Sequence, residues 1–225
     1  MPRPKMPDGL YISVSQVKCY LLCPRKYELH YVLREEPAFV PVALAFGSAF
    51  HSALAAYYGE IKAIGELLRR DLVLDVFRDE WAKAVEGPVP LQAEEDDDES
   101  STDQVVDKGV SMLHAFCEHV AKTIPEVENV EQSFAVPIHD PVTGEVFEEQ
   151  LVGAVDLIVR EDGQRVIVEH KTAAKKYSLD QIRFDLQPTA YQLAAREMRL
   201  GDVGLRYQII TKTKVPAIQI ADLHR

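Results

Sequence analysis

The sequence of 225 residues contains few cysteines and lacks a long apolar segment. Its three cysteines are an odd number at irregular spacing, which does not suit a disulfide framework and favours a reducing compartment. No apolar run approaches the roughly 18 residues of a membrane span. The basic residues after Met1 are not followed by the apolar stretch of a signal peptide. We therefore expect a cytoplasmic protein that has no membrane partner.

The sequence also lacks a phosphate-binding loop of the form GxxxxGK[ST], so we do not expect ATP-driven unwinding from it. Its 25 Lys and Arg against 36 Asp and Glu give a formal net charge of -11, which argues against a protein that coats nucleic acid by neutralising phosphates. An acidic run at 94–99 contributes much of this charge, and we expect a solvated loop over 93–103. Basic residues gather elsewhere, so a basic channel around a site is compatible with the overall charge.

A hydrophobic content of 47% and a charged content of 27% are typical of a soluble globular protein, and we assign residues 1–225 to a single domain. The apolar spacing changes from helical to alternating after Pro125 and returns to helical near residue 179. A cap at Ser13 or Ser15 begins the first helix, and Pro24 either breaks it or begins a second. We expect helices over 13–33, 47–58, 60–85, 103–122 and 179–199, and strands over 130–138, 146–159, 165–170 and 204–211.

The segment 153–172 is typical of two strands joined by a tight turn. Its centre, Glu161-Asp162-Gly163, has turn chemistry, so we expect the strands to pair antiparallel. Side chains alternate along a strand, so Glu169 and Lys171 face one way. On the first strand we expect one face to carry Val155, Leu157 and Val159, and the other to carry Ala154, Asp156 and Ile158.

Two carboxylates of this hairpin, Asp156 and Glu169, are then expected to converge beside Lys171. Close carboxylates repel one another unless a cation separates them, and a hard divalent cation binds oxygen ligands. A nearby lysine can stabilise developing negative charge or position a water molecule. The alternative is a surface hairpin with an acid–base pair, which contributes little to stability.

Four short motifs follow one another along nearly the whole chain, and each is weak alone. They are G-x-x-x-H ending at His51, G-x-x-D ending at Asp156, E-x-K from Glu169 to Lys171, and Q-x-x-x-Y from Gln187 to Tyr191. An N-terminal segment with Ser13, Ser15, Cys23, Pro24, Lys26 and Tyr27 accompanies them. Together they resemble the PD-(D/E)xK nuclease superfamily, and most closely its RecB-like exonuclease branch, to which nuclease domains of recombination helicases and CRISPR-associated exonucleases belong.

The resemblance implies an α/β (α+β) fold with a restriction-endonuclease-like core. In that core a central mixed sheet is flanked by helices, and a helical insert, here 59–126, lies between the first core helix and the first strand. The resemblance also implies a Mg²⁺ or Mn²⁺ cofactor held by His51, Asp156, Glu169 and the backbone carbonyl of His170. The residues it implies in catalysis are Lys171, Glu169, Asp156, Gln187 and Tyr191.

Several of these residues have a plainer alternative. His51 lies among apolar residues, so it could be a core histidine; as a ligand it would favour tolerance of Mn²⁺. Gln187 and Tyr191, four residues apart on one helix face, could be a surface pair or could hold a phosphate beside the metal. We predict nucleic-acid contacts, including stacking of a base on the tyrosine, for Arg25, Lys26, Tyr27, Lys175 and Lys176.

Some RecB-like nucleases carry an iron–sulfur cluster held by one N-terminal and three C-terminal cysteines. Cys23 lies where the first ligand would be, but no cysteine follows Cys117. Four thiolates are the usual requirement, so we expect no iron–sulfur cluster in this sequence. Either a C-terminal segment is missing or the protein is a cluster-free member.

The sequence thus predicts a metal-dependent deoxyribonuclease, an exonuclease acting on DNA ends or single strands in repair, recombination or defence. The alternative is a degenerate nuclease fold that binds nucleic acid or protein without cutting. The helical insert could contact a protein partner in either case, and the sequence does not determine the oligomeric state.

Overall fold

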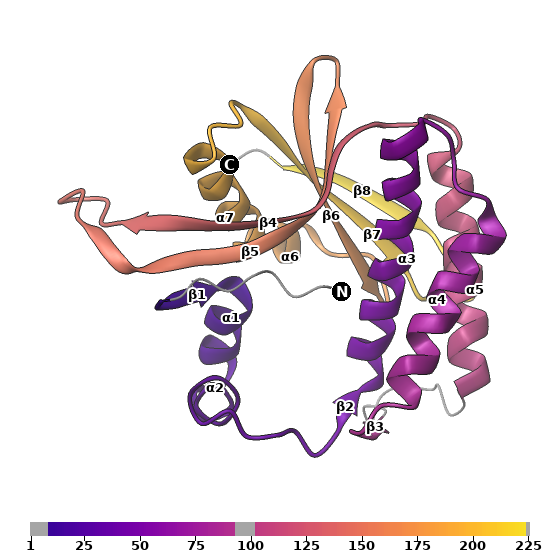
Figure 1. The fold of residues 1–225 in the computed structure, drawn as a ribbon, viewed down its shortest axis with the longest axis horizontal. Coiled ribbons are helices and arrows are strands. Elements are labelled where there is room, and N and C mark those ends of the chain that lie inside the picture. The colour runs from indigo at the N-terminus through magenta and orange to yellow at the C-terminus, as the bar shows by residue number, and fades with distance from the viewer. Residues whose placement is uncertain (1–8, 93–101, 224–225) are drawn as a thin grey trace.

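The computed structural model describes residues 9–92 and 102–223, so most of the predicted acidic loop 93–103 lies outside it (Figure 1). A six-stranded mixed sheet forms the centre of the fold around β5 (Val146–Glu161). One edge of β5 pairs antiparallel with β4 (Glu126–His139). The other edge pairs parallel with β1 (Tyr11–Ser13) at one end and antiparallel with β6 (Gln164–Ala173) at the other. The change of partner leaves the middle of β5, including Asp156, at the point where the two neighbours diverge.

The β5–β6 hairpin forms at the predicted turn. Glu161 pairs with Gln164, and the two residues between them, Asp162 and Gly163, have φ values of 48° and 81°. Two successive residues with positive φ characterise the type I′ turn, whose twist matches that of antiparallel strands.

The other end of the sheet is completed by a crossover. From β6 the chain passes through α6 (Leu179–Arg183) and α7 (Leu186–Glu197) and returns as β7 (Val203–Thr211), parallel to β6. A final strand, β8 (Ile218–Leu223), pairs antiparallel with β7. α7 packs on one face of the sheet, where Ala190, Tyr191, Ala194 and Ala195 meet residues of β4, β5 and β6.

Three long helices cover the opposite face of the sheet (Figure 1). They are α3 (Val42–Ile64), α4 (Arg70–Val85) and α5 (Thr102–Val120), and their buried aromatic and aliphatic side chains form a core with Leu157, Val159, Val166 and Val168. α3 ends at Gly65, whose φ of 73° gives the left-handed C-cap that favours glycine. Two short parallel strands, β2 (Val40–Pro41) and β3 (Leu91–Gln92), join the ends of this layer.

The N-terminal helices lie apart from the three-helix layer, below the extended part of β4 and β5 in Figure 1. α1 (Val14–Leu22) is capped by Ser13 through a capping box with Gln16. The chain turns at Cys23, and Pro24 occupies the first turn of α2 (Pro24–Tyr27), which continues into one π-helical turn, η1 (Glu28–Val32). Pro24 therefore begins a second helix, which was one of the two predicted outcomes.

The predicted mixed sheet flanked by helices is confirmed, but two helix boundaries were wrong and four strands were missed. α3 runs without a break through Gly59, so the expected separation of 47–58 from 60–85 lies instead at 65–69. The expected helix 179–199 is two helices, because Asp185 caps a new one. The strands β1, β2, β3 and β8 were missed; they are short or follow the segment expected to be last.

Strict alternation along β5 was also a wrong prediction near the site. Val155 and Ile158 pack together on the α7 side, while Leu157 and Val159 pack on the α3 side. The irregularity lies opposite Glu131 of β4, whose φ of 47° interrupts the ladder between the Val130–Leu157 and Gln132–Val155 pairs. Within the described ranges no helix is long and apolar enough to cross a membrane.

Candidate active site

Six predicted residues from four elements come together where β5 and β6 diverge from each other, beyond the Leu157–Val168 pair. β5 contributes Asp156, β6 contributes Glu169 and Lys171, α3 contributes His51, and α7 contributes Gln187 and Tyr191. The strand period places Glu169 and Lys171 on the same side, as predicted.

Glu169 is the most enclosed of the acids, with 5% of its surface exposed. Its Oε1 accepts a hydrogen bond from Lys171 Nζ at 2.5 Å, and its Oε2 lies 2.6 Å from the Tyr191 hydroxyl. Burial, followed by the charge of Asp156, raises the pKa of Glu169 to about 7, although Lys171 and Tyr191 act in the opposite direction. A second cation beside this carboxyl would therefore stabilise its charged form.

Gln187 and Tyr191 face the site and are not a surface pair. Gln187 accepts from Lys171 Nζ at 3.0 Å and donates through Nε2 to the Tyr191 hydroxyl at 2.7 Å. The same hydroxyl lies 2.9 Å from the carbonyl oxygen of Ala154. The lysine, the amide, the phenol and Glu169 thus form a closed ring of hydrogen bonds, which fixes the direction of the lysine side chain.

The α7 N-terminus is occupied by its own cap. The Asp185 carboxylate accepts from the backbone N–H of Gln187 at 2.9 Å and pairs with Lys18 of α1 at 2.6 Å. Lys18 therefore ties the N-terminal helices to the site-bearing helix. α7 begins at Leu186, directly before Gln187.

Asp156 joins the α3 side of the site to the backbone of β6. It accepts from the His170 backbone N–H at 2.8 Å, and its Oδ2 lies 3.4 Å from His51 Nδ1 and 3.7 Å from His170 Nδ1. Burial alone would raise the pKa of Asp156, but His51 and His170 hold it well below the ordinary value. For His51 burial lowers the pKa, and the Asp156 carboxylate overcomes this and raises it. His51 is thus paired with an acid and is not an apolar core histidine.

Two side chains beside Asp156 were not assigned to the site from the sequence: the Glu131 carboxylate and the imidazole ring of His170, of which only the backbone carbonyl was predicted. Glu131 lies opposite Asp156 in the strand register and lines the same small hollow as His51 and Tyr58. Burial and the Asp156 charge raise the pKa of Glu131. The His170 ring is 2% exposed and packs between Tyr58 and Phe116. No local pattern predicts these two side-chain contacts, because only tertiary packing brings the Glu131 carboxylate and the His170 ring to Asp156.

Glycine is required at one motif position by packing. A Cβ on Gly153 would lie 2.6 Å from the ring of Phe134, its partner in the β4–β5 register. The Phe134 ring in turn contacts Tyr191 edge-on, with centroids 6.2 Å apart. Because Gly153 has no side chain, the Phe134 ring has room to pack against Tyr191, whose hydroxyl contacts Glu169.

The donor types suit a hard divalent cation, but the donors are not gathered around one point in this structure. Among the described residues, no group of three His, Cys, Asp or Glu side chains lies close enough together to hold a metal ion. The two carboxylates are near enough for each to shift the other electrostatically, and Glu169 is turned toward Lys171 and Tyr191. A metal would therefore require Glu169 to exchange one of these contacts for the cation.

The predicted nucleic-acid contacts do not join this cluster. Arg25 and Lys26 are exposed on α2, where Arg25 pairs with Glu28 at 2.7 Å. Tyr27 contacts the rings of Tyr20 and Tyr31. Lys175 and Lys176 are exposed on the segment that follows β6, four and five residues beyond Lys171 along the chain.

The chain belongs to the PD-(D/E)XK nuclease superfamily, whose family model matches residues 11–223. The chain is therefore a member of a family of phosphodiester hydrolases, and its central mixed sheet has the restriction-endonuclease-like architecture that the resemblance implied. No curated protein matches the chain significantly.

A crystal structure described as a "Putative exonuclease" from Eubacterium rectale is similar to the chain. The sequence identity is 16% and the TM-score is 0.54, and the match covers 95% of this chain and 73% of that one. At this identity the likeness shows the fold alone. The structure of SSO0001 has 16% identity over 93% of this chain and 78% of that chain, and its TM-score of 0.34 carries no argument.

Proposed function

We propose that the chain is a metal-dependent deoxyribonuclease that acts as an exonuclease on DNA ends or single strands. The observation that carries this proposal is that a buried carboxylate, Glu169, lies beside a partly buried one, Asp156, and pairs with one lysine. Glu169 has a pKa raised by burial and by Asp156, and Lys171 is held 2.5 Å from it. Such a pair favours an additional cation, and the lysine supplies a positive charge beside the scissile phosphate.

A divalent cation, Mg²⁺ or Mn²⁺, would be held by His51, Asp156, Glu169 and the backbone carbonyl of His170. When bound there it would lower the pKa of a water molecule and polarise the phosphate. His51 keeps the Asp156 carboxylate charged and oriented. Its imidazole nitrogen is the softer donor of the set, which favours tolerance of Mn²⁺.

The ring of hydrogen bonds that includes Lys171 has a separate role, which is to hold the lysine side chain in place. Gln187 is a second hydrogen-bond acceptor for Lys171 Nζ, so the ammonium would stay at the site when Glu169 turns toward a cation. The ammonium then orients the attacking water and neutralises charge that develops on the phosphate. Tyr191 positions both Gln187 and Glu169 through its single hydroxyl.

We further propose that the α1–α2–η1 segment contacts the nucleic acid. Its Tyr20, Tyr27 and Tyr31 rings are mutually packed, and Arg25 and Lys26 lie beside them. Aromatic rings next to cations suit a single strand, because bases stack and phosphates pair. Lys175 and Lys176 are placed to contact the same strand beyond Lys171. The helical insert 59–126, which contains α4 and α5, would supply the surface for a protein partner.

The test is cleavage of 5′- and 3′-labelled single- and double-stranded DNA with Mg²⁺, Mn²⁺ or EDTA. We expect products of progressive shortening from an end, and no cleavage in EDTA. Lys171→Met should slow cleavage by about 10²–10³-fold, because it removes a charge aimed at the transition state. Lys83→Met is the matched control, since Lys83 lies on α4 and pairs with Glu80.

Three results would each overturn this assignment or a part of it. Full activity of Lys171→Met with an unchanged melting temperature would remove the role of the lysine. Binding of DNA without cleavage under every condition would favour the degenerate binding module. Products from internal cuts alone would replace exonuclease by endonuclease.

A further inference from the structure

The imidazole ring of His170 is enclosed on the α3 side of the sheet, behind the Asp156 carboxylate. It leaves β6 on the face opposite to Glu169, because successive residues of a strand point to opposite faces. The ring packs against the rings of Tyr58 and Phe116, with centroids 5.5 Å and 5.9 Å away. These two aromatic contacts keep the ring out of solvent, so its nitrogens depend on partners inside the protein.

The contacts of Asp156 with two histidines converge on one carboxylate oxygen. The His170 backbone N–H donates to Oδ2 at 2.8 Å, and the Nδ1 atoms of His51 and His170 lie 3.4 Å and 3.7 Å from the same oxygen. At 3.7 Å the ring contact is electrostatic, and it favours a hydrogen on Nδ1 because the carboxylate oxygen is an acceptor. Since these contacts use Oδ2, they leave Oδ1 for a ligand.

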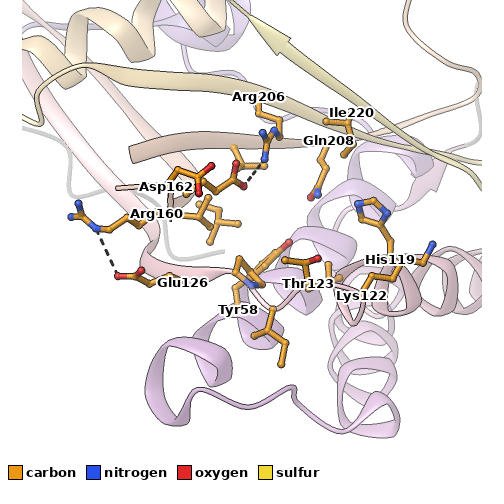
Figure 2. Close-up of a pocket in the computed structure, with 17 residues that line it drawn as sticks. Tyr58, His119, Lys122, Thr123, Glu126, Arg160, Asp162, Arg206, Gln208 and Ile220 are labelled. Atoms are coloured by element: carbon orange, nitrogen blue, oxygen red, sulfur yellow. Dashed lines mark hydrogen bonds and ion pairs between the residues drawn. The ribbon is translucent and has the colours of Figure 1, made fainter. Parts of the chain in front are cut away.

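Gln208 of β7 lies on the other side of the His170 ring. The two residues pair directly in the parallel β6–β7 register, and Gln208 lines a cavity together with Tyr58 on the α3 side of the sheet (Figure 2). The His170 Nε2 and the Gln208 Oε1 are both buried, and neither forms a hydrogen bond with any described residue. Burial lowers the pKa of His170, and its contacts with Asp156 and with the Gln208 amide act in the opposite direction. The amide is therefore the available partner for Nε2.

An amide can serve His170 Nε2 in either protonation state of the ring. When the ring is neutral with its hydrogen on Nδ1, Nε2 is an acceptor, and the NH₂ group of Gln208 can donate to it after a half-turn of the amide. When both nitrogens carry hydrogens, Nε2 can donate to Oε1. In both states the hydrogen on Nδ1 stays directed at Asp156, so the arrangement does not depend on titration of the ring.

We propose that His170 is a positioning residue for the metal ligand Asp156, and that Gln208 holds its ring in place. The backbone N–H and the ring of His170 would fix Oδ2 of the carboxylate, so that Oδ1 is directed to the cation. The proposal rests on the proposed function, because it assumes that Asp156 binds a divalent cation. Loss of such a contact to a metal-binding group changes metal affinity by about 10–100-fold.

The test compares two substitutions whose effects on stability and on metal affinity differ in order. His170→Phe keeps the packing against Tyr58 and Phe116 and removes Nδ1. His170→Asn places an N–H near the position of Nδ1, but it is smaller and polar among aromatic rings. We expect His170→Phe to melt at the higher temperature and to bind Mn²⁺ about tenfold or more weakly than the original chain in titration calorimetry. His170→Asn should melt lower and bind Mn²⁺ more tightly than His170→Phe.

Gln208→Leu tests the support of the ring from its other side. It should weaken Mn²⁺ binding, and it should change the nitrogen NMR spectrum of the metal-free chain, in which His170 is assigned by its absence from His170→Phe. We expect Nδ1 to carry a hydrogen in the original chain and a fraction without this hydrogen to appear in Gln208→Leu. Phe77→Leu is the control, because Phe77 packs on Phe46 and Phe50 in the helical core. It should lower the melting temperature and leave Mn²⁺ affinity and the His170 signals unchanged.

Failure of this proposal and failure of the proposed function give different results. An original chain that binds neither Mn²⁺ nor Mg²⁺ overturns the proposed function and this proposal with it. Intact binding with equal Mn²⁺ affinity in His170→Phe overturns the positioning role alone. The same role is overturned if Mn²⁺ affinity follows melting temperature across the variants, or if Nδ1 carries no hydrogen in the original chain. If His170→Asn does not fold, the comparison of His170→Phe with Phe77→Leu decides, because only the first should lose affinity.

Discussion

Replacing Gly153 by alanine tests whether the motif glycine supports the site through packing. The new Cβ would lie 2.6 Å and 2.9 Å from two ring atoms of Phe134, whereas ordinary contacts begin near 3.4 Å. The ring must therefore move by several tenths of an ångström. Phe134 is 7% exposed and packs on Tyr191, so it has little room to move.

Overpacking of this kind costs about 1–3 kcal/mol. For a chain of this length, each kcal/mol lowers the melting temperature by about 2–4 °C, so we expect a fall of about 2–12 °C. Gly59→Ala is the matched control. A Cβ on Gly59 meets no atom within 4 Å, and alanine in a helix is favoured over glycine by about 1 kcal/mol, so this variant should be stabilised.

The assay is thermal unfolding followed by circular dichroism, combined with a double-mutant cycle. Phe134→Leu removes the ring atoms that clash, so Gly153→Ala should cost less in that background, with a coupling energy of about 0.5–3 kcal/mol. Unchanged melting of Gly153→Ala, or strictly additive effects of the two changes, would refute the packing explanation.

Two further predictions concern the site and its support. Tyr191→Phe removes the hydroxyl that contacts Glu169 and should lower the free energy of unfolding by about 1–3 kcal/mol; equal urea midpoints for both chains would contradict this. For Asp185, burial opposes ionisation, but Lys18 and the Gln187 N–H overcome it and lower the pKa. Because the folded pKa is the lower one, the carboxylate stabilises the fold above its unfolded pKa of about 3.9 and loses this effect as the pH falls through the folded value. Asp185→Asn should therefore weaken stability at neutral pH and flatten its decline in acid, and parallel pH–stability curves for the two chains would count against it.

The local sequence pattern was sufficient to predict the β5–β6 hairpin. The turn forms at Asp162 and Gly163, which are neighbours in the chain. Glu169 and Lys171 are two residues apart, so strand geometry places their side chains on the same side. The helical spacing of Gln187 and Tyr191 is local in the same way, and the structure places both on one face. The order of such elements also predicted the mixed sheet with flanking helices.

Boundaries were less accurate wherever packing outweighed local preference. Gly59 lies inside α3 because both halves of the helix bury apolar residues on the same core, which compensates for the low helix propensity of glycine. The short strand β1 exists because β5 offers an unpaired edge beside it, and a three-residue segment gives no alternation to detect.

The sequence by itself determined the chemical groups of the candidate site and their local order: two acids and a lysine on a hairpin, a histidine on one helix and an amide–phenol pair on another. Only the tertiary structure decided which of them meet. The pairing of His51 with Asp156, the approach of Glu131 and the tie from Lys18 to Asp185 all join residues distant in the chain. Their distances follow from the packing of helices on a twisted sheet, a property of the whole chain that no local pattern contains.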